Sequence, residues 1–199
     1  MNEKFGENPE PKTEEETKED IEQGPDFDRE AEKEQRKEIR KMMVGALSET
    51  LKKEGLAKKS YALWQRKIEN VSQLVYLQRS QFGHEYFIEA GICNEKDIPE
   101  GQKPDIVYCK TRDRIEGIIA EIEKERMPES ENKGQEIKEK INTVNAALDF
   151  DIPGMAEKYP EDYFFPSVGI EEAKEKIETI KKAVGEYIPL WLEKHSKSE

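Results

Sequence analysis

The chain has 199 residues, of which 39% are charged and 34% hydrophobic, and its formal net charge is −12. This length allows one domain plus a tail, and the low apolar content requires part of the chain to stay in water. No run of about 18 apolar residues occurs, and the acidic N-terminus lacks the apolar segment of a secretory signal. We therefore expect no membrane association and a cytoplasmic protein whose two cysteines, Cys93 and Cys109, are reduced.

Residues 1–27 are rich in Glu, Lys, Pro and Gly and have almost no apolar content. Such a segment cannot bury enough surface to offset its chain entropy, so a disordered acidic tail is predicted. Residues 28–199 are expected to form a single domain. Its first helix is predicted over about 29–54, with Gly55 just past its end, because five apolar residues recur at helical spacing: Ile39, Met43, Ala46, Leu47 and Leu51.

After this helix the hydrophobic period changes and predicts a β-meander. Short links between consecutive strands indicate antiparallel pairing. In the central strand Val75 and Leu77 face one side, whereas Leu74 and Tyr76 face the other, so a helix is expected on at least one face. The expected strands span about 61–66, 71–80 and 84–92, with a tight turn at 81–83 and a short fourth strand at 106–109.

The second half of the chain is expected to be mainly helical. Thr111 is a possible cap for an amphipathic segment that follows it. Residues 127–168 are expected to be a linker or insertion, and they include a second amphipathic stretch over about 134–149. A C-terminal helix is expected over about 169–195, with a kink or an end at Pro189. The predicted fold class is α+β: an antiparallel meander of three to four strands flanked by amphipathic helices.

Charge is unevenly distributed along the chain. Residues 1–34 hold 14 acidic and five basic residues, whereas residues 35–80 hold four acidic and 11 basic residues. Two hypotheses fit this basic segment: an anion or nucleic-acid surface masked by the tail, or the ordinary solvated face of a helix and loop. We favour the second, so a nucleic-acid partner is not expected. The candidate basic surface comprises Lys52, Lys53, Lys58, Lys59, Arg66 and Lys67.

Motifs for catalysis, metals and cofactors are weak. A Cys–His nucleophile would pair Cys93 or Cys109 with His84 or His195, but no local signature accompanies these residues. A metal site using His84 and both cysteines lacks the short paired spacing of structural zinc sites. No phosphate-binding glycine motif occurs, and the many carboxylates single out no acid–base pair. We predict no metal, no cofactor and no catalytic residue.

One polar cluster is a candidate site for a ligand or anion. Gln78 and Ser80 close the second expected strand, and Arg112 and Arg114 follow Cys109. Arginine presents a planar fork that suits carboxylate or phosphate groups, so a sheet end with these side chains is able to bind an anion. The alternative, which we favour, is that Gln78 and Ser80 satisfy strand ends and the arginines pair with nearby carboxylates.

Three stretches carry a family resemblance: GLAKKSYALWQR from Gly55, LVYLQRSQFGHEYFIEAGI from Leu74, and CKTRDRI from Cys109. Over about residues 36–122 the chain resembles a bacterial family called domain of unknown function 4304. The resemblance implies an α+β fold with an antiparallel sheet flanked by helices, and it brings no activity or cofactor. The acidic tail and the 127–168 segment depart from the family pattern.

Together these observations favour a non-catalytic protein that binds a macromolecule. An acidic protein of this size suits an immunity- or antitoxin-like role, in which it blocks a basic surface of a protein partner. The alternative is a small-molecule-binding protein or hydrolytic enzyme that uses the polar end of the sheet. The sequence specifies neither the partner nor an oligomeric state.

Overall fold

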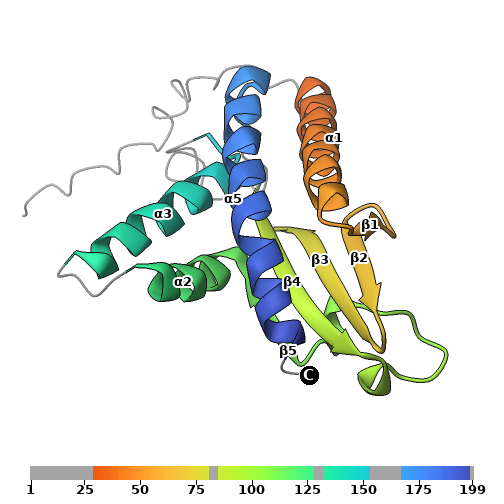
Figure 1. Ribbon diagram of the computed structural model, residues 1–199. Coiled ribbons are helices and arrows are strands. Elements are labelled where there is room, and N and C mark those ends of the chain that lie inside the picture. Colours follow the sequence, from red (N-terminus) through yellow and green to blue (C-terminus); the bar gives the residue numbers. More distant parts are fainter. Residues whose placement is uncertain (1–28, 81–84, 128–131, 153–166, 198–199) are drawn as a thin grey trace, which may run out of the picture.

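The computed structural model describes residues 29–80, 85–127, 132–152 and 167–197. The expected tail at 1–27 and the expected turn at 81–83 lie outside these residues. The described elements form a five-stranded sheet with helices packed on one face (Figure 1). The predicted α+β class with an antiparallel sheet is therefore confirmed. None of the described helices is long and apolar enough to cross a membrane.

Strand order follows chain order, and every neighbouring pair is antiparallel. The sheet therefore has the meander topology that short links predict, with five strands rather than three or four. The strands are β1 (Ala57–Lys58), β2 (Leu63–Ile68), β3 (Val71–Arg79), β4 (Tyr86–Asn94) and β5 (Thr111–Arg114).

Two expectations about short elements are wrong. Residues 106–109 form no strand, because Ile106–Tyr108 is the 3-10 helix η2, whose N-cap Asp105 accepts a hydrogen bond from the Val107 amide. Thr111 does not cap a helix but begins β5, which pairs with β4. The sequence predicts a strand at 106–109 because its residues are apolar. A single 3-10 turn and a short strand can both contain such a short apolar run, so the sequence does not distinguish them.

Four helices complete the described fold: α1 (Arg29–Lys53), α2 (Ile115–Arg126), α3 (Lys133–Leu148) and α5 (Ile170–Ser196). Gly55 follows α1 in the left-handed conformation, with φ of 77°, as expected for a residue that ends a helix. Pro189 does not end α5, which continues through Ser196. A short 3-10 helix, η1 (Glu95–Asp97), follows β4.

The main core lies between the sheet and the helices. Trp64, Val75 and Ile88 are completely buried on the face that the helices cover. Helix α5 contacts α1, α2, α3 and β4, so it is the centre of the helical layer (Figure 1). The alternation in β3 therefore places its apolar residues as predicted, with Val75 and Leu77 in this core.

The opposite face of the sheet has no helix longer than a 3-10 turn packed on it among the described residues. A second, smaller core forms there under the 95–110 loop, from Leu74, Cys93, Ile106 and Cys109. Gly91 allows this loop to approach, because a Cβ atom at Gly91 would lie 2.7 Å from Ile106 Cδ1 and 2.8 Å from Cys109 Sγ. We call this side the open face of the sheet.

Candidate functional site

Three residues of the predicted polar site lie on the open face: Gln78, Arg112 and Arg114. Gln78 is opposite Phe87, Arg114 is opposite Glu89, and Arg112 is opposite Gly91 in the strand register. Ser80 follows the last paired residue of β3. Gly91 in turn pairs with Leu74, so six residues of β3, or about 20 Å, separate the level of Arg112 from Ser80. The four residues are therefore spread along the sheet rather than gathered at one point.

The two arginines already have partners in the protein. Arg114 Nε lies 3.5 Å from Glu89 Oε1, and its guanidinium stacks 4.5 Å from the Phe87 ring centroid. Arg112 donates a long hydrogen bond of 3.5 Å to the Ile106 carbonyl. Both arginines remain solvent-exposed, so a carboxylate or phosphate ligand would compete with these contacts rather than meet a bare cation.

The candidate basic surface divides into three kinds of residue. Arg66 is structural: it donates to the Glu54 carbonyl at the end of α1 (2.6 Å) and to Gln73 Oε1 (2.7 Å). Lys67 forms an ion pair with Glu95, and Lys58 lies 5.4 Å from the Tyr61 ring centroid. The remaining three are exposed, and no ion pair joins them to any described residue: Lys52, Lys53 and Lys59.

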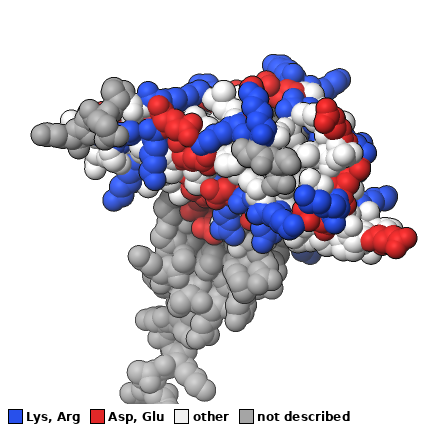
Figure 2. Space-filling view, turned by 60° about the horizontal axis from the view of Figure 1, so that its bottom comes forward, with Lys and Arg blue, Asp and Glu red and all other residues white. Residues whose placement is uncertain are grey.

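Basic and acidic side chains are interleaved over the face of the molecule seen in Figure 2. This view shows no continuous basic stripe of the kind that tracks a nucleic-acid backbone. Electrostatic attraction on this face is therefore local, at particular lysines.

Among the described residues, no histidine activates either cysteine as a nucleophile. Cys93 and Cys109 are both buried, and burial, together with the neighbouring Cys93 thiol, raises the pKa of Cys109. A protonated, buried thiol is a poor nucleophile. His195 lies on α5, where Nε2 is 2.9 Å from Glu121 Oε1, and His84 lies outside the described residues. Among the described residues no group of three or more His, Cys, Asp or Glu is placed to hold a metal ion.

The open face instead carries a groove that the sequence did not reveal. It has a volume of about 930 Å³ and lies between the start of β2 and the loop that leads into η2. Leu63 and Gln65 of β2 contribute to one side, whereas Val107 and Tyr108 contribute to the other. Its other lining residues are Lys59, Ser60, Gly101, Gln102, Lys103, Pro104 and Asp105.

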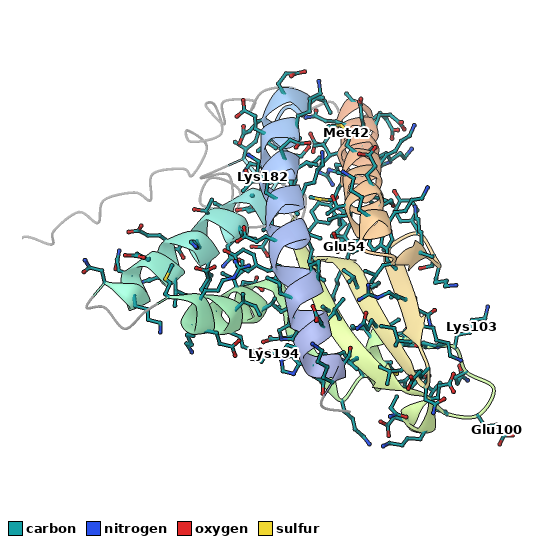
Figure 3. The ribbon with its side chains drawn as sticks, viewed as in Figure 1. Met42, Glu54, Glu100, Lys103, Lys182 and Lys194 are labelled. Atoms are coloured by element: carbon teal, nitrogen blue, oxygen red, sulfur yellow. The ribbon has the colours of Figure 1, made fainter. Side chains whose placement is uncertain are left out.

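The lining combines apolar and cationic groups. Val107 is 63% exposed, the highest value among the large exposed hydrophobic residues that the structure describes. Lys59 and Lys103 are exposed, and neither forms an ion pair with a described residue. Figure 3 shows Lys103 and Glu100 pointing in different directions from the same loop, so Glu100 does not neutralise this lysine. The groove thus combines an exposed apolar side chain with two lysines that have no ion pair to a described residue.

A second, smaller cavity of about 180 Å³ lies where β4 begins, against α2 and α3. Three carboxylate residues line it: Glu85, Glu116 and Asp149. Glu116 Oε2 is buried there without a hydrogen-bond partner. The acidic lining disfavours an anionic ligand, and so the two cavities differ in the charge that they present.

A family model described as a domain of unknown function (DUF4304) matches residues 47–153. This range contains every residue of the groove and all five strands of the sheet, but not α5 or the first part of α1. No curated protein and no solved structure matches the chain.

Proposed function

The chain belongs to the DUF4304 family, and from the surface of its matched domain we propose that it is a non-catalytic protein that binds another protein through the open face of the sheet. The supporting observation is the groove beside β2, where exposed Val107 lies among hydrogen-bonding and cationic side chains. Exposed apolar side chains rimmed by polar residues are typical of interaction sites. The interaction would therefore be centred on Val107.

The chemistry of the described residues also favours binding over catalysis. Both thiols are buried, and the pKa of Cys109 is raised by burial. The candidate arginines contact Glu89, Phe87 and the Ile106 carbonyl, and they are spread along the strand register. General acid–base catalysis needs groups that converge on the reacting atoms, and the candidate side chains among the described residues are not brought together in this way.

The cellular setting is part of the same proposal. We place the protein in the bacterial cytoplasm, because two cysteines without a disulfide suit a reducing compartment. The net charge of −12 would steer a partner that is basic overall toward it, which fits an immunity- or antitoxin-like role, while the groove would contact one segment of that partner. A small-molecule-binding or hydrolytic site at the polar end of the sheet is the alternative proposal. It needs Gln78, Ser80, Arg112 and Arg114 to act on one ligand, and their spread along the strand register favours protein binding over this alternative.

Site-specific photo-crosslinking tests the proposal. A benzoyl-phenylalanine at position 107 should crosslink the full chain to a discrete partner in lysate of the source cell. The same probe at Leu190, an exposed apolar residue on α5, is the matched control and should not capture that partner. Val107→Arg should abolish co-purification of the partner, whereas Leu190→Arg should retain it. Equal capture from both positions, or unchanged co-purification with Val107→Arg, would contradict the proposal.

A further inference from the structure

The groove also indicates the chemistry of its ligand, an inference that rests on the proposed function. We infer that the groove binds a short extended peptide segment of the partner in which one or two carboxylates accompany apolar side chains. The carboxylates would pair with Lys59 and Lys103, and the apolar side chains would contact Val107, Tyr108 and Leu63.

The lysines are the first argument, because Lys59 and Lys103 form no ion pair with a described residue, whereas two other lysines on this side of the sheet do. On the same side of the sheet Lys67 pairs with Glu95, and Lys110 pairs with Asp97. Lys59 and Lys103 have no such pair with a described residue, in a chain that holds 45 acidic residues. Unpaired cations beside an exposed apolar contact are complementary to a ligand that has both properties.

The acidic residue closest in sequence to Lys103 in the lining has another partner. Asp105 Oδ1 accepts a hydrogen bond of 3.2 Å from the Val107 amide, where it caps η2. This bond holds the carboxylate at the helix start and helps to fix the loop that presents Val107. Asp105 therefore organises one wall of the groove and leaves Lys103 available for a ligand.

The lining favours a peptide over a nucleic acid. Leu63, Val107 and Pro104 provide aliphatic surface, and no described arginine lines the groove. Nucleic-acid sites in contrast depend on many phosphate contacts, and a protein of net charge −12 repels a dense polyanion. The same repulsion limits the number of carboxylates that a peptide ligand can carry, which is why the inferred segment is mainly apolar.

Amide chemical shifts of the full chain provide the test. The probe is a synthetic N-acetylated, C-amidated octapeptide of valine, threonine and glycine that contains two glutamates, with a glutamine version and a lysine version as comparisons. The glutamate peptide should shift the amides of Lys59, Lys103 and Val107 at concentrations up to about 2 mM, a weak affinity in keeping with few contacts. The glutamine version should bind about tenfold more weakly.

Reversing the charge of the two groove lysines distinguishes a loss of ligand recognition from a loss of folded structure, because a misfolded variant would not gain affinity for the lysine peptide. The double variant Lys59→Glu/Lys103→Glu should bind the glutamate peptide about tenfold more weakly than the wild type does. It should bind the lysine peptide more tightly. Lys138→Glu/Lys182→Glu is the matched control, because both lysines are exposed on helices and have no ion pair with a described residue. It should bind the glutamate peptide as the wild type does.

Three results would overturn the inference: no shift of the groove amides at about 2 mM, equal binding of the glutamate and glutamine peptides, or stronger effects on the same amides from a single-stranded oligonucleotide. The last result would indicate a nucleic-acid site. If these occur while Val107→Arg still abolishes co-purification, protein binding stands and only the ligand chemistry is wrong. If the peptide binds but co-purification is unaffected by Val107→Arg, the proposed function is wrong instead.

Discussion

At the scale of single residues, Glu123 of α2 is an acidic side chain buried within the helical layer. It is 2% exposed, and it accepts hydrogen bonds from Tyr187 (2.9 Å) and Lys140 (2.6 Å), with Arg126 3.5 Å away. Burial alone would raise the pKa of Glu123, but the bonds from Lys140 and Tyr187 outweigh it, so the pKa is lowered. One carboxylate thus links α2, α3 and α5.

Replacing this carboxylate should destabilise the protein in a pH-dependent way. Because the pKa is lowered in the fold, the carboxylate stabilises it above the ordinary glutamate pKa, and this contribution disappears as the pH falls through the lowered value. We expect Glu123→Gln to cost about 2 kcal/mol of unfolding free energy at pH 7, measured by urea denaturation. The difference from wild type should shrink below about pH 4.

Glu175→Gln, at an exposed position on α5, serves as the control and should be nearly neutral. An equal loss of stability at both positions, or a Glu123→Gln cost that does not change with pH, would contradict the role given to Glu123.

At the scale of elements, two contacts supplement the hydrophobic core in joining the sheet to the rest of the fold. Arg66 bonds the end of α1 and Gln73, and Gln73 in turn donates to the Leu192 carbonyl of α5 (3.2 Å). This chain connects both long helices to the sheet. The second contact is the packing of the 95–110 loop on Gly91, which places η2 and Val107 beside the groove.

Adding one methyl group at Gly91 tests the loop contact. The new Cβ would meet Ile106 and Cys109 at 2.7 to 2.9 Å, so the loop must move away from β4. We expect Gly91→Ala to destabilise the protein by about 1–3 kcal/mol. It should also shift the amide resonances of Val107 and Tyr108 more than those of α5.

The control is Gly134→Ala, because this glycine lies within α3 and a Cβ there would meet no atom within 4 Å. Alanine is the better helix former, so this change should be neutral or stabilising by up to about 1 kcal/mol. A neutral result at Gly91 would show that the loop does not depend on this close approach.

At the scale of the whole molecule, the excess of acidic residues dominates the electrostatics. The net charge is −12, and residues 1–34 hold 14 of the 45 acidic residues. Several lysines are nevertheless exposed without ion pairs to described residues, including Lys52, Lys53 and Lys59. Two hypotheses follow. Either individual lysines such as Lys59 contact a peptide ligand locally, or the acidic N-terminal segment masks a surface that binds a polyanion.

Duplex DNA distinguishes these hypotheses. For the full chain we expect binding weaker than about 10⁻⁴ M near physiological salt, measured by fluorescence anisotropy with a labelled duplex. Deleting residues 1–27 should not change this result, since basic and acidic side chains are interleaved over the face of the molecule seen in Figure 2. A large, salt-sensitive gain in affinity after the deletion would support masking and contradict our expectation.

The sequence by itself determined the features that depend on local periodicity. Alternation in residues 71–79 assigned Val75 and Leu77 to one face and Leu74 and Tyr76 to the other, and helical spacing located α1, α3 and α5 to within a residue or two. These properties are readable because a strand repeats every two residues and a helix every 3.6, whatever lies elsewhere in the chain. The short strands β1 and β5 have too few residues to show a period.

Only the tertiary structure decided which distant residues meet. Arg66 looked like one more surface cation, yet its guanidinium joins α1 to β3, and the two candidate arginines at 112 and 114 have partners on their own sheet and loop. The groove arises because residues 101–108 lie beside Lys59 and Leu63, about 40 positions earlier. No local pattern encodes that juxtaposition, since it is produced by strand register and by the loop packing on Gly91.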